Sequence, residues 1–226
     1  MSEYLPLLPI LLFSVIVHEL AHGWMALRLG DPTARDAGRL TLNPVPHIDP
    51  IGSLLVPLLS LAATGKIFIA WARPVPINPT NFRRLHRDEA LVSAIGPLSN
   101  IVLAFCCTII VIILESLRPE TGLLDSAQGS TLLVFLLRMF YGGIYLNVVL
   151  AVFNLIPVPP LDGSHLLAAI LPTALAAKYQ RIGFLGVFAL IFLLSIPAVG
   201  AAFGHVIGAA VSPFLELVQL FIPHTL

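Results

Sequence analysis

Long apolar stretches alternate with short polar segments along the chain, and this alternation predicts its architecture. The stretches cover residues 5–27, 48–63, 90–117, 132–156 and 182–222. A helix needs about 20 apolar residues to cross the hydrocarbon core of a bilayer, and the first, third and fourth stretches are that long. The last stretch is too long for one helix and contains Pro197 and Pro213, so we expect two helices there. The pattern predicts an α-helical polytopic membrane protein with about four to six membrane segments.

Composition supports the same class of protein. Of 226 residues, 58% are hydrophobic and 11% are charged, whereas soluble domains carry about 25% charged residues. Twelve basic and twelve acidic side chains cancel, so no net charge attracts nucleic acid, and the lipid bilayer is the expected surrounding. No internal repeat or change of composition marks a second domain. We therefore interpret residues 1–226 as a single membrane domain.

Two short segments between the apolar stretches have a β-favouring pattern. Residues 39–43 alternate polar and apolar side chains, residues 66–73 are rich in Ile, Phe and Trp, and prolines follow both. They predict a small β element at the membrane surface. Its apolar part, Ile67–Trp71, could offer an edge to which an unwound peptide adds as a strand. Alternatively, Trp71 could anchor this loop at the membrane interface.

The distribution of cations predicts the orientation of the chain. Eight of the twelve Lys and Arg residues lie between residues 28 and 87. The positive-inside rule therefore places residues 28–88 and 157–181 in the cytoplasm. This arrangement requires residues 48–63 to enter the membrane and return on the same side, so we expect a re-entrant segment. The predicted β element then lies at the cytoplasmic surface.

The first apolar stretch contains three ionisable side chains, in the sequence His18-Glu19-Leu20-Ala21-His22. Residues four apart share one helix face, so the two imidazoles can bind a single Zn²⁺ ion. Glu19 lies about 100° round the helix, where it can take a proton from a water molecule that zinc activates. Ionisable groups are costly in hydrocarbon, and the apolar neighbours offer no partners for a structural role. The motif therefore favours a catalytic metal site.

Two histidines leave that site incomplete, because catalytic zinc usually has three protein ligands. Asp162 is the preferred third ligand, since it follows a long apolar helix within a rigid, proline-rich stretch. Asp49 and His47 compete with it, and the residues alone leave the choice open. His165 is close enough to Asp162 in sequence to support the ligand through a hydrogen bond.

Polar and small residues in the other apolar stretches have two interpretations each. The amide of Asn154 can donate to a carbonyl oxygen on which negative charge develops during hydrolysis, or it can cap the end of its helix. Asn100 and Asn147 are expected to form hydrogen bonds between helices. A glycine face lets helices approach closely, either in a homo-oligomer or within one chain. Its members are Gly200, Gly204 and Gly208.

Three motifs follow one another along the chain: the HExxH sequence, Gly96-Pro-Leu-Ser-Asn100, and a segment from Asn154 to Leu-Asp-Gly163. Together they resemble the site-2 protease family of intramembrane zinc metalloproteases, and the likeness covers essentially the whole chain. The chain is similar to the compact bacterial and archaeal members, with no room for a PDZ or nucleotide-sensing domain. This resemblance implies a location in the plasma membrane of a bacterium or archaeon, and the distribution of cations places the active site towards the cytoplasmic side.

The resemblance also implies a role for each motif residue. His18, His22 and Asp162 would bind the metal, and Glu19 would be the general base. Asn154 would position the substrate or stabilise the transition state. The expected reaction is hydrolysis of a peptide bond in or near a transmembrane segment of a membrane-protein substrate.

The rival class is an intramembrane metal or proton transporter. A transporter is expected to distribute ionisable groups over several helices at different depths, often in repeated halves. This chain instead has one compact HExxH sequence, one preferred downstream carboxylate and no repeat. A purely structural zinc site would have no use for Glu19. The pattern favours a protease.

Overall fold

The computed structural model describes residues 6–49, 72–117 and 131–222, and all regular structure in these ranges is helical. Four helices are long and apolar enough to cross a membrane: α1 (Leu7–Arg28), α4 (Leu85–Ser116), α5 (Thr131–Asn154) and α9 (Pro197–Phe221). Two shorter helices, α7 (Thr173–Gln180) and α8 (Leu185–Ser195), form a pair bent by 73° that could supply a fifth crossing. The prediction of a polytopic helical membrane protein is therefore confirmed.

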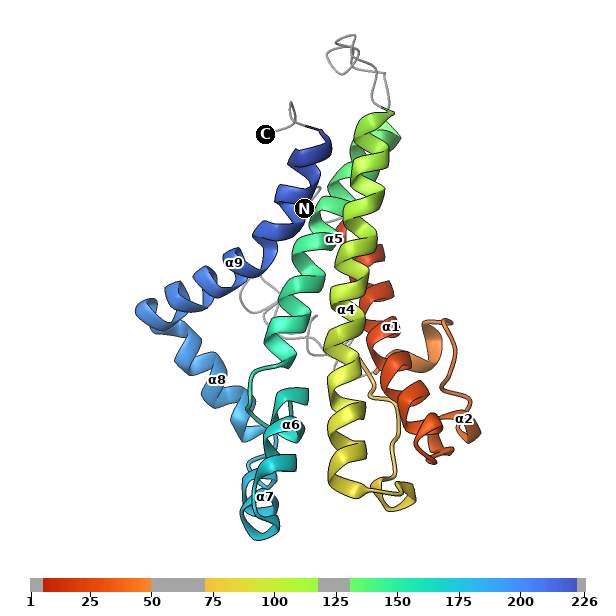
Figure 1. The fold of residues 1–226 in the computed structure, drawn as a ribbon, viewed down its shortest axis with the longest axis vertical. Helices are drawn as coiled ribbons and strands as arrows, with labels where there is room; N and C mark the ends of the chain where they lie inside the picture. The colour runs from red at the N-terminus through yellow and green to blue at the C-terminus, as the bar shows by residue number, and fades with distance from the viewer. Residues whose placement is uncertain (1–5, 50–71, 118–130, 223–226) are drawn as a thin grey trace.

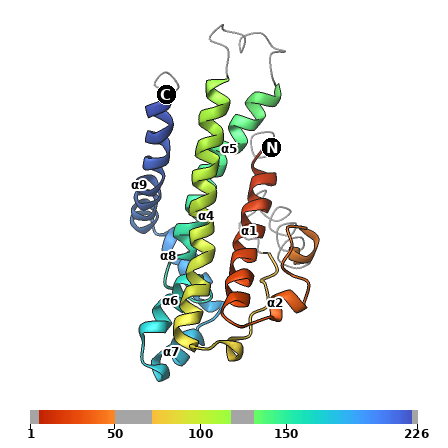
Figure 2. The same ribbon diagram turned by 45° about the vertical axis from the view of Figure 1, so that its right-hand side comes forward.

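Helix α4 is the centre of the bundle. It runs along most of the molecule, with α1 and α5 beside it (Figure 1), and it contacts α1, α5, α6 and α9. Figure 2 shows α1 and α9 on opposite sides of α4. The short helices complete the fold: α2 (Thr33–Asp36), η1 (Val45–His47), η3 (Pro79–Asn81) and α6 (Asp162–Ile170). Helices α6 and α7 lie at the end of the bundle where α4 begins (Figure 1).

The last apolar stretch, residues 182–222, forms two helices, as predicted. The boundary between them falls at Pro197, whereas Pro213 does not break the second helix. Pro197 is the first residue of α9, a position where its missing N–H has no helical partner to lose. Pro213 lies inside α9 without ending it. Its ring frees the carbonyl of Ala209, and the Ser212 hydroxyl donates to that oxygen at 3.2 Å. Serine hydroxyls commonly satisfy such freed carbonyls in membrane helices.

The predicted β element is not found where the structure can be compared with it. Residues 39–43 form no strand, because local hydrogen bonds bend this segment: the Asn43 N–H donates to Thr41 Oγ1, and the Val45 N–H donates to Asn43 Oδ1. Residues 66–71 and the predicted re-entrant segment lie outside the described ranges, apart from residues 48 and 49. Residues 72–78 belong to neither a helix nor a strand. We call them the extended segment because of their drawn-out path beside α1 (Figure 2).

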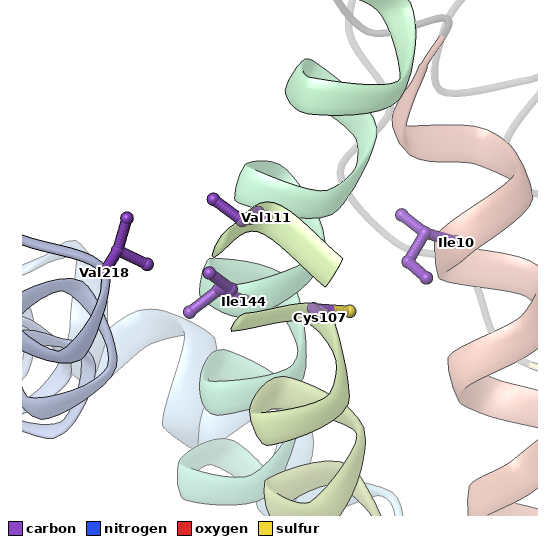
Figure 3. Close-up of a cluster of buried hydrophobic side chains, with 5 residues drawn as sticks. All are labelled: Ile10, Cys107, Val111, Ile144 and Val218. Carbon is purple, nitrogen blue, oxygen red and sulfur yellow. The ribbon is translucent and has the colours of Figure 1, made fainter. Parts of the chain in front are cut away.

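A cluster of buried side chains joins the four long helices (Figure 3). Its members are Ile10, Cys107, Val111, Ile144 and Val218. Lipid is as apolar as these side chains, so close packing holds the helices together, with little contribution from the hydrophobic effect. A Cβ atom at Gly143 would lie 3.0 Å from both Cys107 Sγ and Ile10 Cγ1. The glycine thus lets α5 approach α1 and α4. Gly204 and Gly208 of α9 face open space instead.

Asp31 ties the end of α1 to the segment that precedes α4. Its fully buried carboxylate accepts the N–H of Asn78 and the side-chain amide of Asn81, both at 2.7 Å. It also accepts the N–H of Thr33 at 3.1 Å and the Thr33 hydroxyl. Burial alone would raise the pKa of Asp31, but these donors hold the pKa below its ordinary value.

We expect Asp31→Asn to lower the free energy of unfolding by about 1–3 kcal/mol at neutral pH, because an amide oxygen cannot satisfy all these donors. The folded-state pKa lies below the unfolded value of about 3.9. The advantage of the wild type should therefore be complete above that pH and disappear as the pH falls through the folded-state pKa. Thermal unfolding in detergent across this range measures it. A difference that persists undiminished into strong acid would contradict the assignment.

Candidate metal centre

Two histidines of α1 bring their ring nitrogens to one point. His18 and His22 are one helical turn apart, and their Nε2 atoms lie 3.0 Å from each other. The rings meet edge to face, with 4.6 Å between centroids. Both side chains are buried. Two nitrogen atoms that can bind a metal therefore converge inside the helix bundle.

The third converging atom comes from α6. Asp162 is the first residue of that helix, and its Oδ2 atom lies 3.1 Å from His18 Nε2 and 3.3 Å from His22 Nε2. A tetrahedral zinc ion with bonds of about 2.0–2.1 Å separates its ligand atoms by about 3.3 Å. The three atoms thus have the spacing of a tetrahedral site. No other group of His, Cys, Asp or Glu side chains within the described ranges could hold a metal in this way.

The donor set fits zinc on its own chemistry. Asp162 Oδ2 is buried and accepts no hydrogen bond from the described residues, a situation that is unfavourable unless a cation is bound. A carboxylate binds a metal ion in its ionised form, and bound zinc would satisfy this oxygen. Two imidazoles, one carboxylate and an open position are typical of catalytic zinc.

Two glycines allow the three ligands to meet. A Cβ atom at Gly163 would overlap the carbonyl oxygen of Leu155, so glycine lets the start of α6 fold back against the end of α5. A Cβ atom at Gly96 of α4 would overlap His22 Nε2 and lie 2.7 Å from His18 Cε1. The absence of a side chain there allows both imidazoles to pack directly against α4.

The far nitrogen of each histidine is also engaged. His18 Nδ1 lies 2.6 Å from Asn100 Oδ1, and His22 Nδ1 lies 2.7 Å from the carbonyl oxygen of Val92. Both partners belong to α4. Contacts of this kind orient imidazole ligands and leave the opposite nitrogen for the metal.

Glu19 is held by a backbone amide. Its Oε2 atom accepts the N–H of Val75 at 2.8 Å, and Val75 belongs to the extended segment 72–78. Arg39 holds the same segment, because its guanidinium donates to the carbonyl oxygens of Arg73 at 2.7 Å and Pro74 at 3.2 Å. The extended segment therefore fixes the Glu19 carboxylate.

A cavity of about 400 Å³ connects these groups. It is lined by all three metal-binding candidates, by Glu19, and by part of the extended segment. Further lining residues include Glu89, Asn154 and His165. A cavity of this size has room for water and for an extended piece of substrate beside the converging ligand atoms.

The structure separates the candidates for the third ligand. Asp162 lies beside the two histidines, whereas Asp49 and His47 do not belong to the group. The buried ring of His47 contacts the Thr41 carbonyl through Nε2 at 3.0 Å. His165 faces the same cavity as Asp162, without a direct contact to it among the interactions described.

Asn154 has both features that the sequence suggested. It lines the cavity, and its Nδ2 donates to the carbonyl oxygen of Leu150 at 3.0 Å, near the end of α5. An asparagine amide has two N–H groups, so one hydrogen remains for a substrate. The geometry is compatible with both the catalytic and the structural interpretation.

Sequence reasoning missed several neighbours of the centre. The Val92 carbonyl and the Val75 N–H are backbone groups, and no side-chain pattern reveals them. The sequence could have indicated that Gly96 lies near the centre, because it precedes Asn100 by four residues and must share its helix face. The contact of Arg39 with the extended segment joins residues more than thirty positions apart and has no local signature.

Comparisons with known proteins place these features in a family. The model described as "Peptidase family M50" matches residues 116–194. The chain is 39% identical over 181 residues to "Putative zinc metalloprotease YwhC" of Bacillus subtilis, covering 78% of this chain and 76% of that protein. It is 33% identical over 156 residues to "Putative zinc metalloprotease Rip2" of Mycolicibacterium smegmatis, covering 67% of this chain and 52% of that protein. No solved structure matches.

A helical membrane bundle whose His, His and Asp side chains converge beside a glutamate has the arrangement of a membrane metallopeptidase. The chain belongs to peptidase family M50, so the resemblance to the site-2 protease family is confirmed. The predicted class of enzyme, a metalloendopeptidase with zinc as its cofactor, is confirmed at the level of the family.

We expect Asp162→Ala to weaken zinc binding, because it removes one of three ligand atoms, while Asp49→Ala should retain the metal. The measurement is the zinc content of each purified variant after exchange into metal-free detergent buffer, alongside the wild type. Asp49→Ala is the matched control, since it removes the competing carboxylate. The reverse pattern of zinc loss would assign the third ligand to Asp49.

Proposed function

We propose that this protein is an intramembrane zinc protease that hydrolyses a peptide bond in or near a transmembrane segment of a membrane-protein substrate. In this proposal His18, His22 and Asp162 hold the zinc ion and Glu19 is the general base. The observation that carries the proposal is the convergence of three ligand atoms, separated by 3.0–3.3 Å, beside Glu19 on one cavity.

The depth of the centre supports hydrolysis within the membrane. Helix α1 has 22 residues, which corresponds to a length of about 33 Å. His18 and His22 lie about 16 and 22 Å from its first residue. Both positions fall inside a hydrocarbon core about 30 Å thick, in the half of the helix nearer to Arg28.

The orientation follows from the distribution of charge. The positive-inside rule assigns residues 28–88 and 157–181 to the cytoplasm. The end of α1 and the junction between α5 and α6 then lie towards the same side, which agrees with the contacts of His18 and His22 with Asp162. We infer that the centre opens towards the cytoplasmic side of a prokaryotic plasma membrane.

Bound zinc would act as a Lewis acid and lower the pKa of water at the open position. The Glu19 carboxylate would accept the proton and later deliver it to the leaving amine. The Val75 N–H holds one oxygen of Glu19, which leaves the other oxygen available. The free amide hydrogen of Asn154 would donate to the substrate carbonyl oxygen as negative charge develops there.

The substrate must present an unwound peptide bond, because a helix hides its amides in hydrogen bonds. The cavity beside the centre is a place for such a segment. A transporter is not favoured, since the ligand atoms converge on one point and are not spread across the membrane.

We expect Glu19→Gln to retain zinc and to lose hydrolysis. Both imidazoles remain, and the glutamine carbonyl can still accept the Val75 N–H, but the amide cannot act as a base. Zinc content and cleavage of a transmembrane peptide would be measured on the same detergent preparation, with chelator-treated wild type as the inactive reference. Wild-type turnover in this variant would exclude Glu19 as the base.

We expect Asn154→Ala to lower kcat by about a hundredfold or more, as removal of an oxyanion donor does in other enzymes. Zinc content and KM should change little. Asn154→Asp is the control for shape, because it keeps the size of the side chain without an N–H donor, and kcat should fall in the same way. A lower thermal midpoint with unchanged kcat would show that Asn154 only stabilises the end of α5.

A further inference from the structure

A chain of buried amides leads from the metal centre across three helices. His18 Nδ1 of α1 contacts Asn100 Oδ1 of α4 at 2.6 Å. Asn100 Nδ2 donates to Asn147 Oδ1 of α5 at 2.9 Å, and Asn147 Nδ2 donates to the carbonyl oxygen of Gly143 at 2.9 Å. Both asparagines have no exposed surface. We call Asn100, Asn147 and the Gly143 carbonyl the amide relay.

The amide relay has only one consistent direction. The Gly143 carbonyl can only accept, so the group of Asn147 that faces it must be the NH₂. The oxygen of Asn147 then faces Asn100, which must present its own NH₂. The oxygen of Asn100 is thereby directed at His18, whose Nδ1 must carry the hydrogen. His18 Nε2 is left with its lone pair, and this atom is the one that faces Asp162 Oδ2.

We propose that Asn147 is a positioning residue of the metal centre, which acts through Asn100 to set the tautomer and ring orientation of His18. This inference rests on the proposed zinc site and adds a residue that is neither a proposed ligand nor one of the residues that line the cavity. His22 needs no such relay, because its Nδ1 contacts the Val92 carbonyl directly. A backbone carbonyl that can only accept therefore places the hydrogen on Nδ1 of both imidazoles, directly for His22 and through the amide relay for His18.

Burial between the helices fixes this direction. An asparagine amide can rotate by half a turn and exchange its oxygen and nitrogen with little change of shape. In water, a rotated amide would find other partners. Asn100 and Asn147 are fully buried between helices, so a rotated Asn147 would set its oxygen against the Gly143 oxygen. Two facing acceptors repel, and the relay keeps its orientation.

The first test measures the zinc dissociation constant by competition with a chelator. Loss of a group that orients a ligand commonly weakens metal affinity by about 10–100-fold. We expect Asn100→Leu to fall in this range and Asn147→Leu to weaken binding about tenfold. The double variant should bind no more weakly than Asn100→Leu, because both residues act along one path. Additive losses would contradict a shared path.

The second test separates direction from packing. In Asn100→Asp, the carboxylate accepts from His18 Nδ1 whichever oxygen it presents, so the direction supplied by Asn147 becomes unnecessary. Asn147→Leu should therefore weaken zinc binding in the wild-type background. It should cause no weakening in the Asn100→Asp background, where it also removes the Asn147 oxygen that would face the carboxylate. An equal weakening in both backgrounds would show that Asn147 acts by packing alone, and would overturn the proposal. So would an unchanged affinity in the wild-type background.

A matched control comes from the same helix as Asn100. Thr108 is also fully buried in α4, and its hydroxyl donates to the Ala104 carbonyl at 2.9 Å, outside the amide relay. Thr108→Val should retain wild-type zinc affinity. Zinc affinity alone tests whether the amide relay acts on His18, whereas cleavage of a transmembrane peptide tests the proposed function. A wild type that binds zinc but cleaves no peptide would refute the function, and the background comparison would still decide the relay.

Discussion

Three lone-pair atoms that face one another inside a helix bundle are the constraint on which this structure depends. The Nε2 atoms of His18 and His22 and the Oδ2 atom of Asp162 lie 3.0–3.3 Å apart. Such atoms repel in a medium without water unless a cation neutralises them. The neighbouring structure accommodates this meeting: Gly96 leaves room for both rings, and Gly163 lets α6 fold back towards them.

The centre is coupled to the packing of the whole bundle. Both histidines belong to α1, their outer nitrogens contact α4, and the amide relay continues into α5. Close packing of these helices has little hydrophobic drive within lipid, so buried polar contacts contribute specificity that apolar side chains do not. The same contacts that hold the helices in register also orient the proposed metal ligands. Stability of the fold and geometry of the site are therefore linked properties of this protein.

The extended segment 72–78 joins the centre to the residues that follow α1. Its backbone accepts two hydrogen bonds from Arg39 and donates one to Glu19, and the Asp31 carboxylate holds its end through Asn78. These four hydrogen bonds thus orient a carboxylate that a helix alone would leave free to change rotamer. The proposed hydrolysis needs a place for water, and the cavity lined by this segment and α1 has room for it.

The sequence by itself determined the class of protein, the main helices and the pair of histidines. Apolar length is enough to predict a crossing helix, and a spacing of four residues is enough to place two imidazoles on one face. It preferred Asp162 as the third ligand without excluding Asp49, and it wrongly predicted a strand at residues 39–43. Only the tertiary structure brought Asp162 to the histidines, gave Glu19 its backbone donor and set the direction of the amide relay. These contacts join segments far apart in the chain, and several use backbone groups, so no local pattern of side chains encodes them.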